Sequence, residues 1–153
     1  MPMNQQAVSE ICFEETYCVP AEQTARSLFA RLPHGRGYAQ TLIECLATGY
    51  LVAVVESICI REMQRLVDPL TDVVVGRSMR IDHFGPIPPA TCLRLRGWVE
   101  RIGERSATFC VRAHDDHEVV FDGTVTLVAT QRTVIEPRIA AKVSALLAAR
   151  ANA

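Results

Sequence analysis

The sequence predicts an α+β fold in which one antiparallel sheet wraps around a single long helix. Between Tyr50 and Ile60 every residue is apolar except Glu56 and Ser57. A helix that is apolar on nearly all sides is typical of the interior of a protein. After Pro69 the apolar residues recur at every second position instead, which is the period of β-strands.

The apolar stretch is too short to cross a membrane. Charged residues return at Arg61, whereas a membrane span needs about 20 predominantly apolar residues. The first ten residues are polar and lack the apolar segment of a signal peptide, so we expect a cytoplasmic protein with no membrane contact. The balance of 16 basic and 17 acidic residues also indicates no nucleic-acid partner.

The length of 153 residues suits one domain with a good core. We expect a flexible N-terminus over residues 1–8, the main domain over 9–136 and a C-terminal helix over 137–153. The six cysteines form no C-x-x-C pair and mostly lie in apolar segments. We therefore expect them to be small reduced core residues, with no disulfide framework or metal site.

Before the central helix, residues 9–19 alternate as in a strand, which Pro20 ends. Residues 21–32 are expected to hold a short helical turn, and 33–37 a loop because they contain proline and glycine. Thr48 is a good N-cap for the central helix. The helix should stop near Pro69, since the residue before a proline disfavours the helical conformation.

Four strands are expected after the helix, over residues 72–84, 91–102, 105–114 and 118–131. The last three follow one another through short turns, so they pair antiparallel. Gly97 is a candidate bulge. The core face of the first of these strands is predicted to hold Val73, Val75, Met79, Ile81 and His83.

This order of a strand, a loop, one long helix and four antiparallel strands is the hotdog architecture. A single sheet of this kind has open edges, and natural proteins avoid leaving such edges unpaired. Pairing with a second copy is the usual remedy, so we expect at least a homodimer.

Glu56 is the anomaly in the central helix. A carboxylate taken out of water must find polar partners or reach a cleft. Perturbed carboxylates gather at functional sites but also occur in structural ion pairs. From the residues alone, both a functional role and a simple ion pair with an arginine stay open.

The stretch Leu46–Ile60 resembles the helix of hotdog thioesterases of the fluoroacetyl-CoA thioesterase type. The resemblance continues through Asp68-Pro69, Ile81-Asp82-His83, Pro88-Pro89 and Ala140–Val143. It implies an acyl-CoA thioesterase that needs no cofactor and no metal. The implied catalytic residues are Thr48, Glu56 and His83, and the glycines expected beside the substrate are Gly49 and Gly76.

The chemistry of a thioester suits these residue types. A thiol has a pKa of about 8.5, so the leaving group needs little help from a strong acid. Glu56 can attack as a nucleophile, giving an anhydride, or act as general base on water. Thr48 can bind or orient the carbonyl, and His83 can orient Glu56 or water or assist thiolate departure. On one regular helix, however, Thr48 and Glu56 lie about 12 Å apart. Either Thr48 lies on a loop that folds back before the helix, or a partner subunit completes the site. We expect the site to lie at or near the dimer interface.

Other interpretations stay open at this stage. A hotdog enoyl-CoA hydratase or dehydratase is one alternative, and a non-catalytic acyl-CoA-binding protein is another. The acyl group and the choice between coenzyme A and acyl carrier protein as donor are undetermined. The outward arginines Arg94, Arg96 and Arg112 could meet coenzyme A phosphates, although a solvated strand face is the better interpretation. We interpret residues 114–117, His-Asp-Asp-His, as a solvated turn rather than a metal site.

Overall fold

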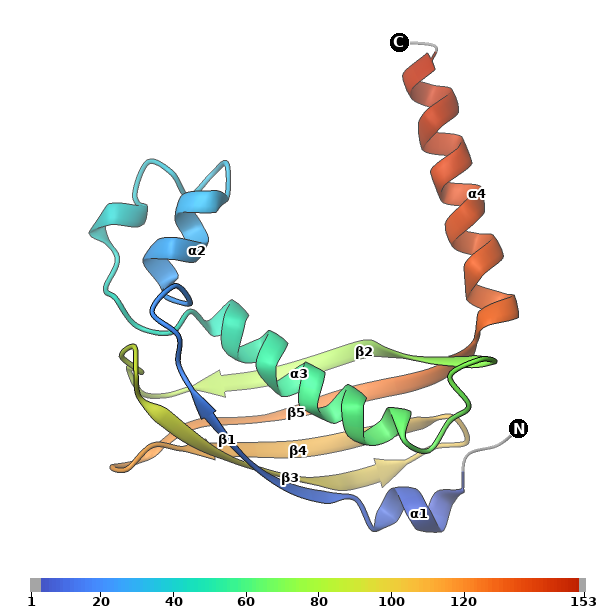
Figure 1. Ribbon diagram of the computed structural model, residues 1–153, viewed down its shortest axis with the longest axis horizontal. Helices are drawn as coiled ribbons and strands as arrows, with labels where there is room; N and C mark the ends of the chain where they lie inside the picture. Colours follow the sequence, from blue (N-terminus) through green and yellow to red (C-terminus); the bar gives the residue numbers. More distant parts are fainter. Residues whose placement is uncertain (1–3, 152–153) are drawn as a thin grey trace.

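The computed structural model describes residues 4–151, in which a five-stranded antiparallel sheet curves around helix α3 (Figure 1). The helix comprises Thr48–Gln64. The predicted sheet around one long helix is therefore confirmed. The strands lie in the order β1 (Cys12–Cys18), β3 (Cys92–Ile102), β4 (Ser106–His114), β5 (Val119–Gln131) and β2 (Asp72–His83).

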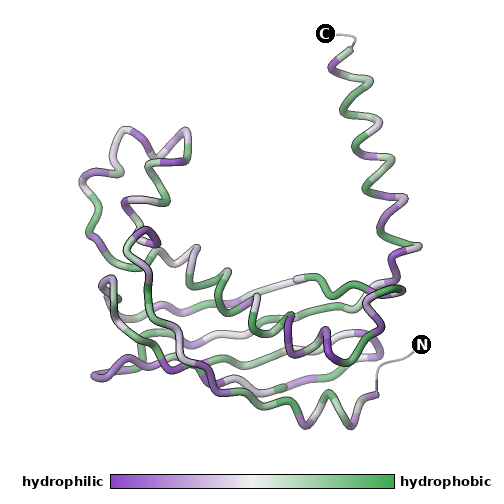
Figure 2. The backbone as a smooth tube through the Cα atoms, in the orientation of Figure 1, coloured by the Kyte–Doolittle hydropathy of each residue, from purple (hydrophilic) through white to green (hydrophobic). Residues whose placement is uncertain are grey.

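Helix α3 packs on the sheet through one face only. Its buried residues are Leu51, Val55, Cys59 and Met63, which recur every fourth position. They meet apolar strand residues such as Phe109 in a single core, and full burial of each such side chain is worth about 1.5–3 kcal/mol. The apolar colour in Figure 2 follows both α3 and the strands beneath it. The expected burial on all sides is wrong, because a single sheet covers a single face of a helix.

Strand β2 contains a bulge that changes which residues face the core. Its pairing with β5 shifts at Arg77, where one extra residue is inserted. A one-residue shift reverses the in–out alternation of a strand. Val74 is therefore buried before the bulge, while Met79 packs against the core after it. The prediction that Val73 and Val75 share the face of Met79 is wrong for this reason.

The N-terminal residues are more ordered than expected. Residues 4–8, predicted as part of a flexible tail, belong to helix α1 (Gln5–Ser9) and its cap. The side chain of Asn4 caps this helix by accepting a hydrogen bond from the Ala7 N–H, and Val8 is fully buried. Residues 1–3 of the predicted tail lie outside the described part of the chain.

Two short helices form a projecting segment beside the start of α3. They are α2 (Ala25–Arg31), where a short helix was predicted, and the 3₁₀ helix η1 (Ala39–Thr41). A bridge between Thr24 and Leu46 closes the base of this segment. We refer to residues 25–47 as the α2–η1 segment.

Helix α4 (Arg132–Ala151) begins five residues before the predicted start at 137. Strand β5 leads directly into it, and the Arg132 N–H donates to the Thr71 carbonyl at 2.8 Å. Pro137 lies inside the helix, where its missing N–H removes one backbone hydrogen bond. The helix projects from the body of the protein and contains no buried residue (Figure 1). Over residues 4–151 no helix is both long and apolar enough to span a membrane.

The expectation that all six cysteines are reduced is wrong for two of them. Cys18 and Cys92 form a disulfide, and both are exposed on the sheet surface. They are direct partners in the antiparallel register of β1 and β3. A separation of 74 residues in the chain conceals this contact from sequence spacing. Of the four free cysteines, Cys59 is buried as predicted. The prediction of a core position is wrong for Cys12, which is exposed, while Cys45 and Cys110 are half-buried.

The prediction that Gly97 is a bulge is wrong. Gly97 instead leaves room for an aromatic ring to pack against the strand. Its partner in β1 is Phe13, whose ring contacts the position that a Cβ at residue 97 would occupy. The bulge of β3 falls at Glu100 instead. A glycine inside a strand often marks such a close approach.

We expect Gly97→Ala to destabilise the fold by about 1–3 kcal/mol, because the added methyl displaces the buried Phe13 ring. Urea unfolding followed by circular dichroism measures this change. Gly37→Ala is the matched control, since a Cβ there meets nothing within 4 Å. Equal midpoints for the two variants would contradict the role of Gly97.

Candidate active site

Thr48 and His83 form a direct contact at the junction of α3 and β2. The Thr48 Oγ1 and His83 Nδ1 atoms lie 2.9 Å apart, at hydrogen-bonding distance. Thr48 is the first residue of α3, and Ala47 occupies the N-cap position. The predicted capping role of Thr48 is therefore wrong, because its hydroxyl is bonded to the histidine instead.

The second ring nitrogen of His83 is buried and lacks a hydrogen-bond partner within the described residues. Leaving such an atom unsatisfied costs about 1–3 kcal/mol. Burial lowers the pKa of His83, and a hydrogen bond with the backbone of Gly85 partly opposes this shift. Burial therefore favours the neutral ring, in which one nitrogen lies against Thr48 and the other is enclosed by the protein.

The amino end of α3 adds two backbone donors. The N–H groups of Thr48 and Gly49 have no acceptor among residues 4–151. Both residues line a cleft of about 310 Å³ together with His83. The remaining wall is largely apolar and includes Phe29 and Ile43. A carbonyl oxygen in this cleft would meet the free donors at a helix amino terminus, where negative charge is favoured.

Glu56 lies two turns farther along α3. Its side chain is half-buried and forms no ion pair or hydrogen bond within the described chain. The alternative interpretation, that Glu56 forms a structural ion pair with an arginine, is therefore wrong for the described residues. Its carboxylate fills the space that a side chain at Gly76 would need. Gly76 thus makes room for the carboxylate of Glu56.

One protomer does not bring all the predicted residues together. Eight positions along a helix separate Thr48 from Glu56 by about 12 Å. Seven positions of extended strand separate Gly76 from His83 by about 23 Å. The cleft beside Thr48 accordingly does not include Glu56. The predicted site residues thus fall into two groups, one with Thr48, Gly49 and His83 and the other with Glu56 and Gly76. We call these groups half-sites because the prediction assigns them to one active site.

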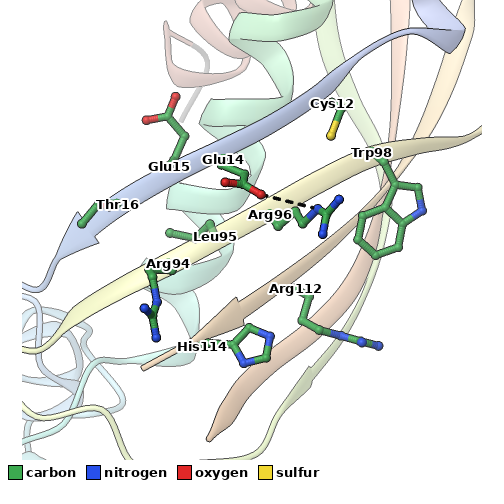
Figure 3. A pocket seen from close by; sticks show the side chains of 10 residues that line it. All are labelled: Cys12, Glu14, Glu15, Thr16, Arg94, Leu95, Arg96, Trp98, Arg112 and His114. Atoms are coloured by element: carbon green, nitrogen blue, oxygen red, sulfur yellow. Dashed lines mark ion pairs between the residues drawn. The ribbon is translucent and has the colours of Figure 1, made fainter. Parts of the chain in front are cut away.

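A larger groove, of about 640 Å³, lies on the sheet face away from α3 (Figure 3). Its lining includes the outward arginines Arg94, Arg96 and Arg112. Arg112 donates to Asp122 at 2.6 Å, and Arg96 lies 3.7 Å from Glu14. These pairings support the interpretation of the arginines as a solvated strand face.

Two further candidates have structural explanations. Asp115 accepts hydrogen bonds from the N–H groups of His117 and Glu118, both at 2.8 Å, and these bonds lower its pKa. That arrangement is an ordinary turn. Burial raises the pKa of the Cys59 thiol to about 12, which removes it as a nucleophile.

An antiparallel sheet that curves around one long helix places this chain among the hotdog proteins. A hot-dog-like protein from Thermanaerovibrio acidaminovorans matches 86% of this chain and 90% of its own, with a TM-score of 0.71 and 14% identity. A thioesterase superfamily member from Thermus thermophilus matches 90% and 94%, with a TM-score of 0.75 and 16% identity. At these identities the likeness concerns the fold alone.

The sequence places the chain more narrowly. The profile of the fluoroacetyl-CoA-specific thioesterase (FlK) family matches residues 34–136, so the chain belongs to this family. The predicted thioester hydrolase is thereby confirmed. The fluoroacetyl-CoA thioesterase of Streptantibioticus cattleyicolor is 25% identical over 112 residues, 73% of this chain and 77% of that protein. A solved structure of FlK covers 86% of this chain and 94% of its own, with a TM-score of 0.76 and 22% identity.

The lowered pKa of His83 predicts a pH dependence of stability. Below a pH of about 6.5 the unfolded chain binds a proton that the buried ring resists, so stability falls as the pH decreases through this value. We expect the urea midpoint of His83→Gln to decrease less between about pH 7.5 and 5.5 than that of the parent. His34→Gln, at an exposed histidine, should behave like the parent. Parallel curves for all three proteins would contradict this assignment.

Proposed function

We propose that this protein hydrolyses an acyl-CoA thioester to a free acid and coenzyme A, in a site shared by two copies of the chain. The observation that supports this most is the half-buried Glu56 carboxylate, which has no cationic partner within residues 4–151 and occupies space left open by Gly76. A carboxylate kept in this setting is suited to attack or to proton transfer. The name of the curated relative, fluoroacetyl-CoA thioesterase, supports coenzyme A as the thiol.

The chain's edge strand suggests how the half-sites meet. Strand β2 is at the end of the sheet, so two copies can pair through it antiparallel about a two-fold axis. With the axis between Met79 and Arg80, Gly76 of one copy lies opposite His83 of the other. Adjacent strands are only about 5 Å apart. This pairing therefore brings Glu56 of one copy toward the Thr48–His83 pair of the second.

The proposed reaction uses each group in one role. The thioester carbonyl lies in the cleft, with its oxygen toward the free N–H groups of Thr48 and Gly49. Glu56 takes a proton from a water that attacks the carbonyl carbon, or its own carboxylate attacks that carbon. In the second case an anhydride forms, and water then hydrolyses it. The C–S bond breaks and coenzyme A leaves as a thiolate that takes up a proton. His83, held by Thr48, orients the water or Glu56 or assists departure of the thiolate.

The dimensions of the cleft suggest a small acyl group. Its volume of about 310 Å³ and its apolar wall, which includes Phe29 and Pro86, fit a short chain rather than a long one. A panel of acyl-CoA thioesters of increasing length would define the limit. An acyl carrier protein as donor is tested in the same panel by supplying the same acyl group on a carrier.

Glu56→Gln should abolish hydrolysis and leave coenzyme A binding intact, because the amide keeps the shape but loses the basic oxygen. We expect the rate of thiol release to fall at least about 100-fold, as for other general bases. A thiol-reactive dye measures release, and calorimetry measures coenzyme A binding. Tight binding without turnover by the parent protein would instead favour the acyl-CoA-binding alternative.

Mixing two inactive variants tests whether the site is shared. Glu56→Gln and His83→Ala are each expected to be inactive alone. If Glu56 and His83 act across the interface, each mixed dimer has one site with both residues intact. Random reassortment should then restore about one quarter of the parental activity per chain. No recovery, with mixed dimers demonstrated by mass spectrometry, would place all three residues of a site in one chain.

A further inference from the structure

Helix α4 presents an apolar face that nothing in the described protomer covers. Its large apolar residues Val134, Ile139, Val143, Leu146 and Leu147 are all between 48% and 61% exposed. Positions 139, 143, 146 and 147 follow the i, i+4, i+7, i+8 spacing of a single helix face. Isolated helices are marginally stable in water, and helices in proteins gain most of their stability from the packing of such a face. A covering surface is therefore expected.

A second group of exposed apolar residues lies in the α2–η1 segment and directly after β2. Leu32, Tyr38 and Ile43 belong to the α2–η1 segment, and Phe84 follows the last residue of β2. Their exposed fractions lie between 44% and 68%. Ile43 itself lines the cleft that contains Thr48 and His83. An apolar residue of the cleft wall, Ile43, is thus open to water in the protomer, as are three other apolar residues of this group.

The two apolar surfaces lie at opposite ends of the same edge strand. Helix α4 starts beside the beginning of β2, where Arg132 donates from its backbone to Thr71 and from its Nε to the Pro69 carbonyl at 2.9 Å. Phe84 and the α2–η1 segment lie at the other end of β2. In Figure 1, α2 and α4 project to the same side of the molecule from these two ends. An antiparallel two-fold pairing of β2 places the start of each strand beside the end of its copy.

From this we infer that α4 of a second copy packs its apolar face on Leu32, Tyr38, Ile43 and Phe84 and forms the outer wall of the cleft. The contact is made twice in the dimer, because each copy donates one helix and receives one. The docking of α4 depends on the pairing of two copies through β2 that is part of the proposed function, and so does the description of that cleft as the acyl-thioester site. The family profile ends at residue 136, so most of α4 lies outside the family's matched region.

Site-specific photo-crosslinking tests the contact directly. A benzophenone amino acid is placed at Val143 on the apolar face or, as matched control, at Ala141 on the opposite face. An equal mixture of isotope-labelled and unlabelled chains identifies intermolecular products. We expect cross-links from position 143 to residues 25–47 or Phe84 of the other copy, and none from position 141. Cross-links within one chain, cross-links between two α4 helices, or no cross-links at all would overturn the inference.

A second pair of variants tests the effect on the cleft. Ile139→Glu/Leu146→Glu places charges on the apolar face, whereas Ala141→Glu/Ala148→Glu places them on the opposite face. We expect the first to speed hydrogen exchange of residues 25–47 about tenfold or more and to raise KM for acyl-CoA, and the control to do neither. Unchanged exchange in the first variant would overturn the inference. Because exchange is measured without substrate, it gives an answer even if hydrolysis itself is absent.

Discussion

The packing of α3 against one face of a single sheet is the contact on which the rest of the structure depends. It buries Leu51, Val55, Cys59 and Met63, and it sets the helix beside β2 in the opposite direction. The start of α3 therefore lies at the end of β2, which brings Thr48 to His83. The same packing leaves the other side of the helix and the outer edge of β2 uncovered. These uncovered surfaces are the reason for expecting a second copy.

The bulge at Arg77 allows residues on both sides of it in β2 to face α3. Before it, Val74 fills the core and Gly76 leaves room for a carboxylate. After it, Met79 and Ile81 pack on the core and His83 reaches the helix start. Without the extra residue, one of these groups would face away from α3. The strand thus supports both half-sites while remaining part of one continuous core.

Two apolar surfaces of the protomer are incompletely buried, namely the face of α4 and the residues around Ile43. A two-fold pairing through β2 would bring the two surfaces together with one symmetry operation. This pairing is the physical argument for a site shared between subunits. It would also account for a 20-residue helix that extends from the protomer without burying a side chain.

Local pattern was enough to predict the strands and the long helix, since period and residue type are properties of short segments. The assignment of Thr48, Glu56 and His83 to one site came from the family resemblance and stays a prediction. It was not enough to predict the face of Val74, because a bulge depends on pairing with β5. It also missed the Cys18–Cys92 disulfide and the packing of Phe13 on Gly97, since both depend on the register of β1 with β3. The hydroxyl of Thr48 was assigned to a cap because its true partner lies 35 residues away. Residue identity determined what chemistry is available, and only the long-range contacts decided which groups meet.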